Sequence, residues 1–477
     1  MSSETLAGER DSHTRTSRAL TITLVVVLVA ELMNALDGSI VYTALPTIAG
    51  DTGATSAAVQ WIAAAYTLVF ALGLITGGRL GDLFGRKRVF LAGTAGFTVA
   101  SLLCAVATGP GMLIAARAIQ GGAAAVIVPQ VLTTLYVSFD GAARAKAFGL
   151  YGLIMSLGGV LGPVLGGVLT GADPFGLGWR SIFVINLPVG LATVALAWRC
   201  MPESSDPYAR RVDPIGILLC GSGLLLIVYP LTVGGQHRWP AWSVGMLLAG
   251  LAVLGAFIAQ QRRNSSPLMP LSLFRGRAFV GGVCAQLIFG LISGVFLLTW
   301  TLFMQDGLGL SAAQFAPAAA AVAVGGMGGA MFASKLVVAQ ARRVPQAGAL
   351  LVALTLAGYQ LMVTAQGTGV PVPAAIAPML ALGCGFGMIG AGVAALALGQ
   401  VDPADMGSAS GVFNTAMQVG TAVGIALASV VYFVHAPAGS EGLEVTTAFA
   451  AALRYAIGAV VLMWALLFLL PGRRARD

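Results

Sequence analysis

The sequence predicts an all-α polytopic membrane protein with fourteen transmembrane helices. Of its 477 residues, 57% are hydrophobic and only 9% are charged, whereas soluble globular proteins carry about 25% charged residues. The apolar residues recur in runs of about 20, the length that an α-helix needs to cross the hydrocarbon core of a bilayer. The 64 glycines fit this class as well, because membrane helices pack backbone to backbone.

Fourteen apolar runs divide the chain, and a polar segment stands at each end. No small-residue cleavage site follows the first run, so we expect this run to be a membrane span and not a removed signal peptide. The spans are expected at residues 19–42, 57–77, 89–108, 111–133, 144–169, 181–200, 213–234, 241–261, 278–302, 313–336, 346–365, 373–397, 407–434 and 447–470.

The basic residues lie almost entirely in the short segments between the runs. If the N-terminus is cytoplasmic, the cytoplasmic segments hold 22 lysines and arginines, and the opposite loops hold only Arg180 and Arg238. Cytoplasmic loops carry an excess of Lys and Arg, so we expect both termini in the cytoplasm. The net charge of +8 therefore reflects topology and does not indicate a nucleic-acid partner. The 23 arginines against three lysines point to a high-GC bacterial genome, and hence to a bacterial plasma membrane.

The sequence contains no pattern typical of a cofactor, a metal site or catalysis. The five cysteines are scattered singly, without CxxC or Cys/His spacing, which argues against a disulfide framework and against a metal site. No Walker A pattern occurs, so this chain alone is not expected to use ATP. The loops are too short for a soluble domain, and we therefore expect neither an enzyme nor a sensor.

A charged loop follows the second run, where residues 78–88 read G-R-L-G-D-L-F-G-R-K-R. Asp82 in this loop can meet the N-terminus of a neighbouring helix or the adjacent arginines, and such a cluster can latch one conformation. An ordinary positively charged loop is the alternative. The residues expected to act together in a cytoplasmic gate are Gly78, Asp82, Gly85, Arg86, Lys87 and Arg88.

Further motifs accompany this loop. The first span ends L-D-G-S-I-V (36–41), the fourth contains R-A-I-Q-G (117–121), and the fifth contains G-G-V-L-G-P-V-L-G-G (158–167). Together and in this order, they resemble the major facilitator superfamily, in particular its fourteen-span drug:H⁺ antiporter branch. The loop at 78–88 is similar to the family signature G-x-L-a-D-r-x-G-r-k and departs from it at Leu83. The resemblance covers essentially the whole chain.

The resemblance implies a major facilitator fold with two six-helix halves and two additional central helices. The expected divisions are a cytoplasmic N-terminal tail at 1–18, an N-terminal half at 19–200, two central helices at 201–262, a C-terminal half at 263–470 and a cytoplasmic C-terminal tail at 471–477. It also implies a monomer that exports drugs, antibiotics or similar amphipathic small molecules in exchange for protons. A transporter of a metabolite, peptide or siderophore on the same fold, including a symporter, remains the alternative.

Four charged residues fall inside the predicted spans: Glu31, Asp37, Arg117 and Arg454. A charge at the bilayer centre costs about 2.5–3.5 kcal/mol on insertion scales, so such residues usually mark function. At about 1.5 Å of rise per residue, Asp37 and Arg117 lie at a similar depth, where an ion pair or a water-bridged contact can form. This pair serves either as structural glue or as a switch in which Asp37 becomes protonated.

Glu31 lies near the midplane, where no basic residue obviously shares its depth. Burial without a cationic partner favours the neutral form of a carboxyl group, so Glu31 is suited to load and release a proton. Six residues, or about 240° around a helix, separate it from Asp37. We expect Glu31 to carry the exchanged proton or to pair with a cationic substrate, with Asp37 as its main competitor and Arg117 as part of the same coupling set.

Polar residues on several spans are candidates for a substrate cavity. Asn414 and Gln418 share one face of the thirteenth span at spacing i and i+4. A cavity with acids and aromatic groups suits amphipathic or cationic compounds. The predicted lining consists of Asn34, Gln60, Tyr66, Gln120, Asn414 and Gln418.

The fifth span carries a glycine-rich face, which the resemblance identifies as an antiporter helix. Glycines three and four residues apart let another helix approach closely, and Pro163 removes a backbone hydrogen bond and kinks the helix. We expect a moving seam between the halves here, with immobile tight packing as the alternative. The residues of this face are Gly158, Gly162, Pro163, Gly166 and Gly167.

Overall fold

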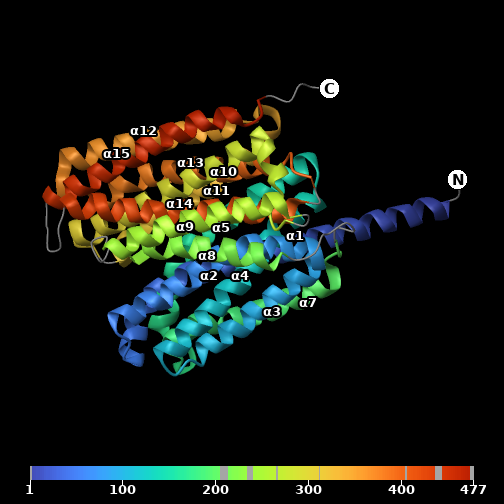
Figure 1. Ribbon diagram of the computed structural model, residues 1–477, viewed down its shortest axis with the longest axis horizontal. Helices are drawn as coiled ribbons and strands as arrows, with labels where there is room; N and C mark the ends of the chain where they lie inside the picture. The colour runs from blue at the N-terminus through green and yellow to red at the C-terminus, as the bar shows by residue number, and fades with distance from the viewer. Residues whose placement is uncertain are drawn as a thin grey trace.

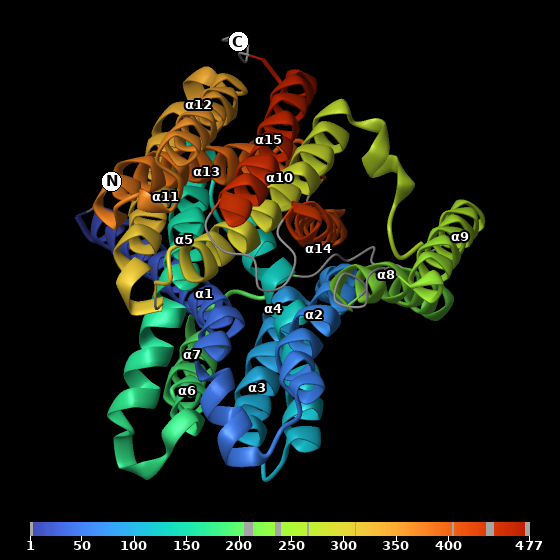
Figure 2. The same ribbon diagram turned by 90° about the vertical axis from the view of Figure 1, so that its left-hand side faces the viewer.

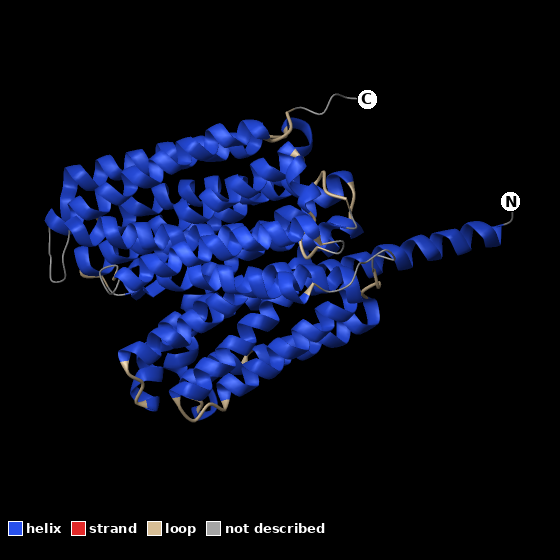
Figure 3. Cartoon of the chain, viewed as in Figure 1, coloured by secondary structure: helices blue, strands red, loops and turns tan. Residues whose placement is uncertain are grey.

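The computed structural model describes residues 3–204, 213–233, 240–264, 267–310, 312–402, 405–435 and 443–472, and every regular element within them is a helix (Figure 3). The α-helices are α1 (Ser3–Thr52), α2 (Ser56–Phe84), α3 (Arg86–Ala105), α4 (Pro110–Ser138), α5 (Gly141–Ala172), α6 (Ser181–Val184), α7 (Asn186–Cys200), α8 (Pro214–Val233), α9 (Ala241–Arg263), α10 (Arg277–Leu302), α11 (Ala312–Gln340), α12 (Arg343–Gln366), α13 (Val372–Leu398), α14 (Met406–His435) and α15 (Leu443–Leu466). Short 3₁₀ turns lie at Pro174–Gly176, Gly178–Arg180, Leu271–Arg275, Gly367–Gly369 and Leu467–Leu469, and a π-helical turn at Phe303–Gly307.

The helices are long and apolar enough for the predicted number of spans. Thirteen of those described could cross a membrane on their own, and α5 makes a fourteenth if its two bent parts count as one span. The parts of α5, Lys146–Gly159 and Val164–Ala172, meet at 45°. The sixth predicted span contains α6 and α7, and the candidate span runs over Gly178–Cys200. The predicted all-α polytopic class is therefore confirmed.

The helices form two bundles with a pair of helices beside them. Helices α1–α7 pack mainly with one another, as do α10–α15, and Figure 1 shows these groups as the lower and upper parts of the molecule. We call them the N-terminal half and the C-terminal half. Helix α8 packs on α2 and on α14, and α9 packs on α8 at the edge of the molecule (Figure 2). The pair thus touches both halves through α8.

The two halves approach each other at the end of the molecule that carries residues 78–88, which we call the motif end. A Cβ added to Gly78 near the end of α2 would lie 2.0 Å from the carbonyl oxygen of Gly407 at the start of α14. A Cβ added to Gly149 of α5 would lie 2.5 Å from Cβ of Ser334 in α11. Toward the opposite end, the halves diverge (Figure 1). The structure is therefore that of a conformation closed at the motif end.

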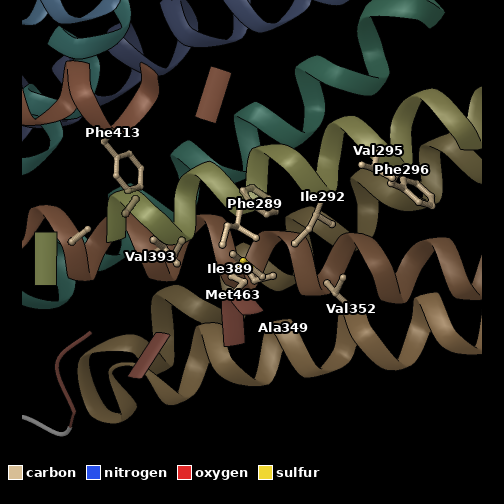
Figure 4. Close-up of a cluster of buried hydrophobic side chains, with 14 of the residues drawn as sticks. Phe289, Ile292, Val295, Phe296, Ala349, Val352, Ile389, Val393, Phe413 and Met463 are labelled. Atoms are coloured by element: carbon tan, nitrogen blue, oxygen red, sulfur yellow. The ribbon is translucent and has the colours of Figure 1, made fainter. Parts of the chain in front are cut away.

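Apolar side chains fill the interior of each half. In the C-terminal half, Phe289 and Ile292 of α10 pack among Val352 of α12 and Ile389 of α13 (Figure 4). All four are buried. Each such side chain contributes about 1.5–3 kcal/mol in water, but lipid is itself apolar, so close packing stabilises these helices more than burial does.

Candidate functional site

Asp37 of α1 and Arg117 of α4 form an ion pair inside the N-terminal half. Nη1 of Arg117 donates to Oδ2 of Asp37, and the two residues are 1% and 0% exposed. The Nε–H of Arg117 also donates to the carbonyl oxygen of Ile62, at 3.3 Å. The structure thus brings together two residues for which the sequence predicts an equal depth. Removing either charge would leave the other buried without compensation.

Three neutral side chains complete the surroundings of Asp37. Its Oδ1 accepts from Nε2 of Gln120 at 2.8 Å and from Nδ2 of Asn186 at 2.9 Å. Oγ of Ser101 accepts from the same two nitrogens, at 2.9 and 3.3 Å, and Oε1 of Gln120 accepts from Arg117 at 2.7 Å. Both oxygens of Asp37 therefore have donors. We call Asp37, Ser101, Arg117, Gln120 and Asn186 the locked cluster.

The locked cluster corrects one sequence-based prediction and adds two residues. Gln120 was predicted to line a substrate cavity, but this prediction is wrong because its amide is fully buried between Asp37 and Ser101. Asn186 and Ser101 were not among the predicted site residues. Asn186 is a single amide within the sixth predicted span, and Ser101 is a single hydroxyl in an apolar run. Neither residue type carries a signal without its neighbours in space.

Tyr66 of α2 links the locked cluster to a second group of polar residues. The guanidinium carbon of Arg117 lies 4.2 Å from the centre of the Tyr66 ring, a distance at which a cation and an aromatic face attract each other. At the other end of the ring, the Tyr66 hydroxyl donates to Oδ1 of Asn34, at 2.5 Å. Tyr66 therefore contacts Arg117 with its ring face and Asn34 with its hydroxyl.

Glu31 lies on the other side of this link and is 0% exposed. Neither carboxylate oxygen makes a hydrogen bond with the described residues, although the amide of Asn34 lies close by. The carboxyl group borders a cavity of about 200 Å³ between α1, α2, α4, α5 and α14. The polar side chains that line the cavity are Glu31, Asn34, Tyr66, Thr67, Tyr151, Asn414 and Gln418.

The cavity contains most of the residues predicted for it. Asn34, Tyr66, Asn414 and Gln418 line it, and Tyr151 is an addition that no sequence pattern indicated. Gln60 belongs to α2, but its side chain lies outside the described residues. A volume of about 200 Å³ is smaller than the roughly 300–1,000 Å³ of pockets that enclose drug-sized ligands. In this conformation the cavity is therefore too small to enclose a drug-sized molecule.

The charged residues of the predicted spans lie in three different surroundings. Asp37 lies in the locked cluster and Glu31 at the cavity, as the angle of about 240° between them on the helix requires. Arg454 of α15 is exposed on the surface of the C-terminal half. It therefore joins neither group, and its long side chain is free to reach the membrane surface.

At the motif end, Asp82 lies between two helices. Its side chain is 0% exposed and lies 3.5 Å from Nη2 of Arg86. The carboxylate faces the backbone N–H of Ser408 in the first turn of α14, and a Cβ added to Gly407 would lie 2.6 Å from Oδ1 of Asp82. The predicted contact between Asp82 and a helix N-terminus is therefore present, and this N-terminus belongs to the opposite half.

The rest of the loop is held by the segment that follows α7. Gly85 has φ of 95°, in the region that favours glycine. Oε1 of Glu203 accepts from the backbone N–H of Lys87 at 3.1 Å, and Oε2 lies 3.6 Å from Nε of Arg88. Arg86 donates to the hydroxyl of Ser204 at 3.5 Å. The loop is thus held by contacts within the N-terminal half, while Gly78 and Asp82 lie against Gly407 of α14.

The glycine face of α5 packs within the N-terminal half. Cβ atoms added to Gly158, Gly162 and Gly166 would lie 2.3 Å from Cβ of Ala35, 1.9 Å from Oγ of Ser39 and 2.1 Å from Oγ1 of Thr43. These neighbours all belong to α1, so the prediction of a moving seam between the halves is wrong for this face. An added Cβ on Gly167 would meet open space. The contact of α5 with the other half lies near its start, at Gly149 and Gly152.

The bend in α5 lies between Gly159 and Val164, a segment that includes Pro163. A proline at this place removes one backbone hydrogen bond and bends the helix. The side chain of Pro163 lies outside the described residues. The bend carries the start of α5 toward α11 and leaves the glycine face on α1.

Comparison with known proteins agrees with this architecture. The chain is 40% identical over 418 residues to a probable actinorhodin transporter of Streptomyces coelicolor, with 86% of this chain and 72% of that protein covered. It is 37% identical over 425 residues to the cephamycin export protein CmcT of Amycolatopsis lactamdurans, with 87% and 85% covered. Its fold is similar to the crystal structure of the human organic anion transporter MFSD10, with a TM-score of 0.66, 16% identity, and 94% of this chain and 99% of that chain covered.

The family profile extends over most of the chain. The profile described as Major Facilitator Superfamily matches residues 27–425, which run from the first predicted span into α14. This stretch contains the motif loop, the locked cluster and the lining of the cavity. The chain therefore belongs to the Major Facilitator Superfamily, and it is a multi-pass membrane protein of that family.

Proposed function

We propose that this protein exports antibiotics or similar amphipathic small molecules, and that each export step is coupled to the entry of protons. The relatives named above include a probable antibiotic transporter and an antibiotic export protein. The observation that carries the proposal is Glu31, a carboxyl group with no hydrogen-bond partner among the described residues that borders a cavity between the halves. A substrate cation and a proton would compete for this one group.

The competition at Glu31 accounts for exchange. A buried carboxylate without a partner is costly, so the empty site favours a neutral, protonated Glu31. A cationic substrate that enters the cavity stabilises the ionised form and displaces the proton. The aromatic faces of Tyr66 and Phe70 line the same cavity, and they offer further attraction for a cation.

The locked cluster couples the occupied site to the rest of the N-terminal half. In the described conformation, Arg117 is held by Asp37 and lies over Tyr66, which holds Asn34. Protonation of Asp37 would remove the charge that holds Arg117. The guanidinium would then shift relative to the Tyr66 ring and alter the position of Asn34 beside Glu31. Two acids on α1 thus communicate through Arg117, Tyr66 and Asn34.

The described conformation fits one stage of this cycle. The distribution of basic residues predicts that the motif end faces the cytoplasm. A conformation closed at that end is the one in which a proton enters from outside and substrate leaves. The opposite conformation would require α14 to leave Asp82. Proton entry can supply about 2.3 kcal/mol per charge for each 100 mV of membrane potential, and alternating access around a site at the midplane converts this energy into export.

The proposal is tested in proteoliposomes with an imposed pH gradient, in which proton flux is followed on addition of actinorhodin, a cephamycin or tetraphenylphosphonium. We expect wild-type protein to move protons in response to at least one of them and Glu31→Gln to move none. Substrate-driven proton flux that survives in Glu31→Gln would assign the proton to Asp37 instead. Uptake of substrate together with protons would overturn antiport and favour a symporter.

A further inference from the structure

A buried polar cluster joins the two additional helices at the motif end. Asp213 directly precedes α8 and is 5% exposed, and Gln261 near the end of α9 is 3% exposed. Nε2 of Gln261 donates to Oδ2 of Asp213 at 2.7 Å, and Nε2 of Gln260 donates to both oxygens at 3.1 and 3.2 Å. The N–H of Gly216 donates to Oδ1 at 2.9 Å. One carboxylate thus receives donors from two helices.

The cluster continues into the segment that connects α9 to the C-terminal half. We call residues 267–276 the strap. Oε1 of Gln261 accepts from the backbone N–H of Met269 at 3.0 Å. The carbonyl oxygen of the preceding Leu268 accepts from the hydroxyl of Ser408 at 3.3 Å. Leu268, Met269 and Ser408 are all buried, so the strap is fixed at one side to α9 and at the other to the first turn of α14.

The strap reaches α14 at the same turn that faces the motif loop. The backbone N–H of Ser408 faces Asp82, while its hydroxyl holds Leu268. Helix α8, which begins at the polar cluster, packs on α2 as well as on α14. Two connections therefore run between α2 and the start of α14. One is the direct contact of Asp82, and the other passes through α8, the polar cluster and the strap.

A simple helix cap accounts for only part of this geometry. An aspartate before a helix commonly accepts one backbone N–H of the first turn, and serine does so equally well. Asp213 makes this contact with Gly216 but also receives two glutamine side chains from α9. A Cβ added to Gly216 would lie 2.3 Å from Oδ2 of Asp213 and 2.6 Å from Nε2 of Gln261. The first turn of α8 thus leaves room for the contact between the helices.

We propose that Asp213, Gln261 and Ser408 are positioning residues that hold α14 against α2 through the strap and so stabilise the conformation closed at the motif end. Opening this end requires α14 to move away from α2. The strap opposes this movement because it joins α14 to a helix pair that packs on α2. On this view, the two additional helices take part in the conformational cycle. The inference depends on neither the substrate nor the coupling ion.

The proposal is tested by measuring the distance between spin labels at the motif end of purified full-length protein. The labels are placed on Phe84→Cys of α2 and Gln340→Cys of α11, two exposed positions, after the five native cysteines have been replaced. A buried hydrogen bond contributes about 1 kcal/mol, or a factor of about five in an equilibrium. Gln261→Ala and Ser408→Ala are each expected to raise the ratio of open to closed distances about five-fold.

Two further variants separate the strap from the helix cap. Asp213→Ser retains a residue that can cap α8 but loses the hydrogen bonds from Gln260 and Gln261. We expect it to open the motif end as much as Gln261→Ala. Ser222→Ala on α8 removes a hydroxyl whose hydrogen bonds, among the described residues, go to carbonyl oxygen atoms of its own helix, and it should keep the wild-type distribution. The proposal is overturned if Gln261→Ala and Ser408→Ala keep that distribution, or if Asp213→Ser behaves as Ser222→Ala does.

Discussion

Glu31 and Asp37 lie six residues apart on the same helix, and their surroundings are opposite. Asp37 accepts hydrogen bonds from Arg117 and from the side-chain amides of Gln120 and Asn186. It does not line the cavity. Glu31 receives no hydrogen bond from the described residues and borders the cavity. Because successive residues turn by about 100° around a helix, six positions are enough to send one acid into the half and the other toward the interface. One helix thus holds one acid in an ion pair and leaves the other at the cavity without a counter-charge among the described residues.

The largest expected effect comes from breaking the pair in the locked cluster. Arg117→Met leaves Asp37 buried without a counter-charge, which costs about 3–5 kcal/mol. We expect a large loss of stability in thermal unfolding of the detergent-solubilised protein. Adding Asp37→Asn to this variant should restore part of the loss, because no buried charge then remains.

An exposed ion pair supplies the control for this experiment. Asp140→Asn removes the partner of Arg144 at the start of α5, where Asp140 is 93% exposed. Exposed pairs contribute little, so its unfolding temperature should stay close to that of wild type. If the double variant of Asp37 and Arg117 is as unstable as Arg117→Met alone, an unpaired charge on Asp37 is not the cause of the instability, and the prediction is contradicted.

The second prediction concerns stability and coupling at Glu31. Glu31→Gln keeps the shape of the side chain and loses no hydrogen bond to the described residues. Its unfolding temperature should therefore equal or exceed that of wild type, while substrate-driven proton flux is lost. The control is Glu444→Gln, at an exposed acid at the start of α15, which should alter neither property. A strongly destabilised Glu31→Gln would mean that the acid is a structural group.

The third and smaller effect concerns the link between the two acids. Tyr66→Phe keeps the ring under Arg117 but removes the hydroxyl that donates to Asn34. The loss of one buried hydrogen bond costs about 1 kcal/mol, so the protein should fold. We expect fewer protons to move per exported substrate in proteoliposomes.

Tyr42→Phe serves as the control, because Tyr42 is 54% exposed on α1. An unchanged ratio of protons to substrate in Tyr66→Phe would disprove the communication through Tyr66. The two acids would then act independently, and the comparison between them would rest on their surroundings alone.

The smallest effect lies outside the spans, at Asp51 after the first span. Hydrogen bonds from Trp179 and Arg180 lower the pKa of the Asp51 carboxyl below 3.8. A lowered folded-state pKa stabilises the protein above the unfolded-state pKa, and this stabilisation disappears as the pH falls through the folded-state value. Asp51→Asn should therefore be slightly less stable than wild type at pH 7, and the difference should shrink as the pH falls below about 3.8 and vanish below the folded-state pKa. A difference that is constant with pH would contradict the charge-based contact.

The sequence predicted the spans and the intramembrane charges because these depend on local composition. Runs of apolar residues follow from the thickness of the bilayer, and the equal depth of Asp37 and Arg117 follows from the helical rise alone. The two kinds of partner predicted for Asp82, a helix N-terminus and the adjacent arginines, are both present, at Ser408 and Arg86.

The sequence could not reveal which helix faces a given residue. Gln120 is a polar residue inside an apolar span, as a residue that lines a cavity would be. The rotation of α4 nevertheless directs its side chain to Asp37. The glycines of α5 face α1 and not the other half, because the pairing of α1 with α5 is a property of the tertiary packing. Asn186 and Ser101 become recognisable only when three helices bring them to the same carboxylate.

The most direct test of the account is the number of protons released when substrate binds. Purified protein in weakly buffered detergent is mixed with actinorhodin, a cephamycin or tetraphenylphosphonium while the pH is recorded, for wild type, Glu31→Gln and Glu444→Gln. We expect wild type and Glu444→Gln to release about one proton for each substrate bound, and Glu31→Gln to release none. A Glu31→Gln protein that binds substrate and still releases a proton would contradict this expectation.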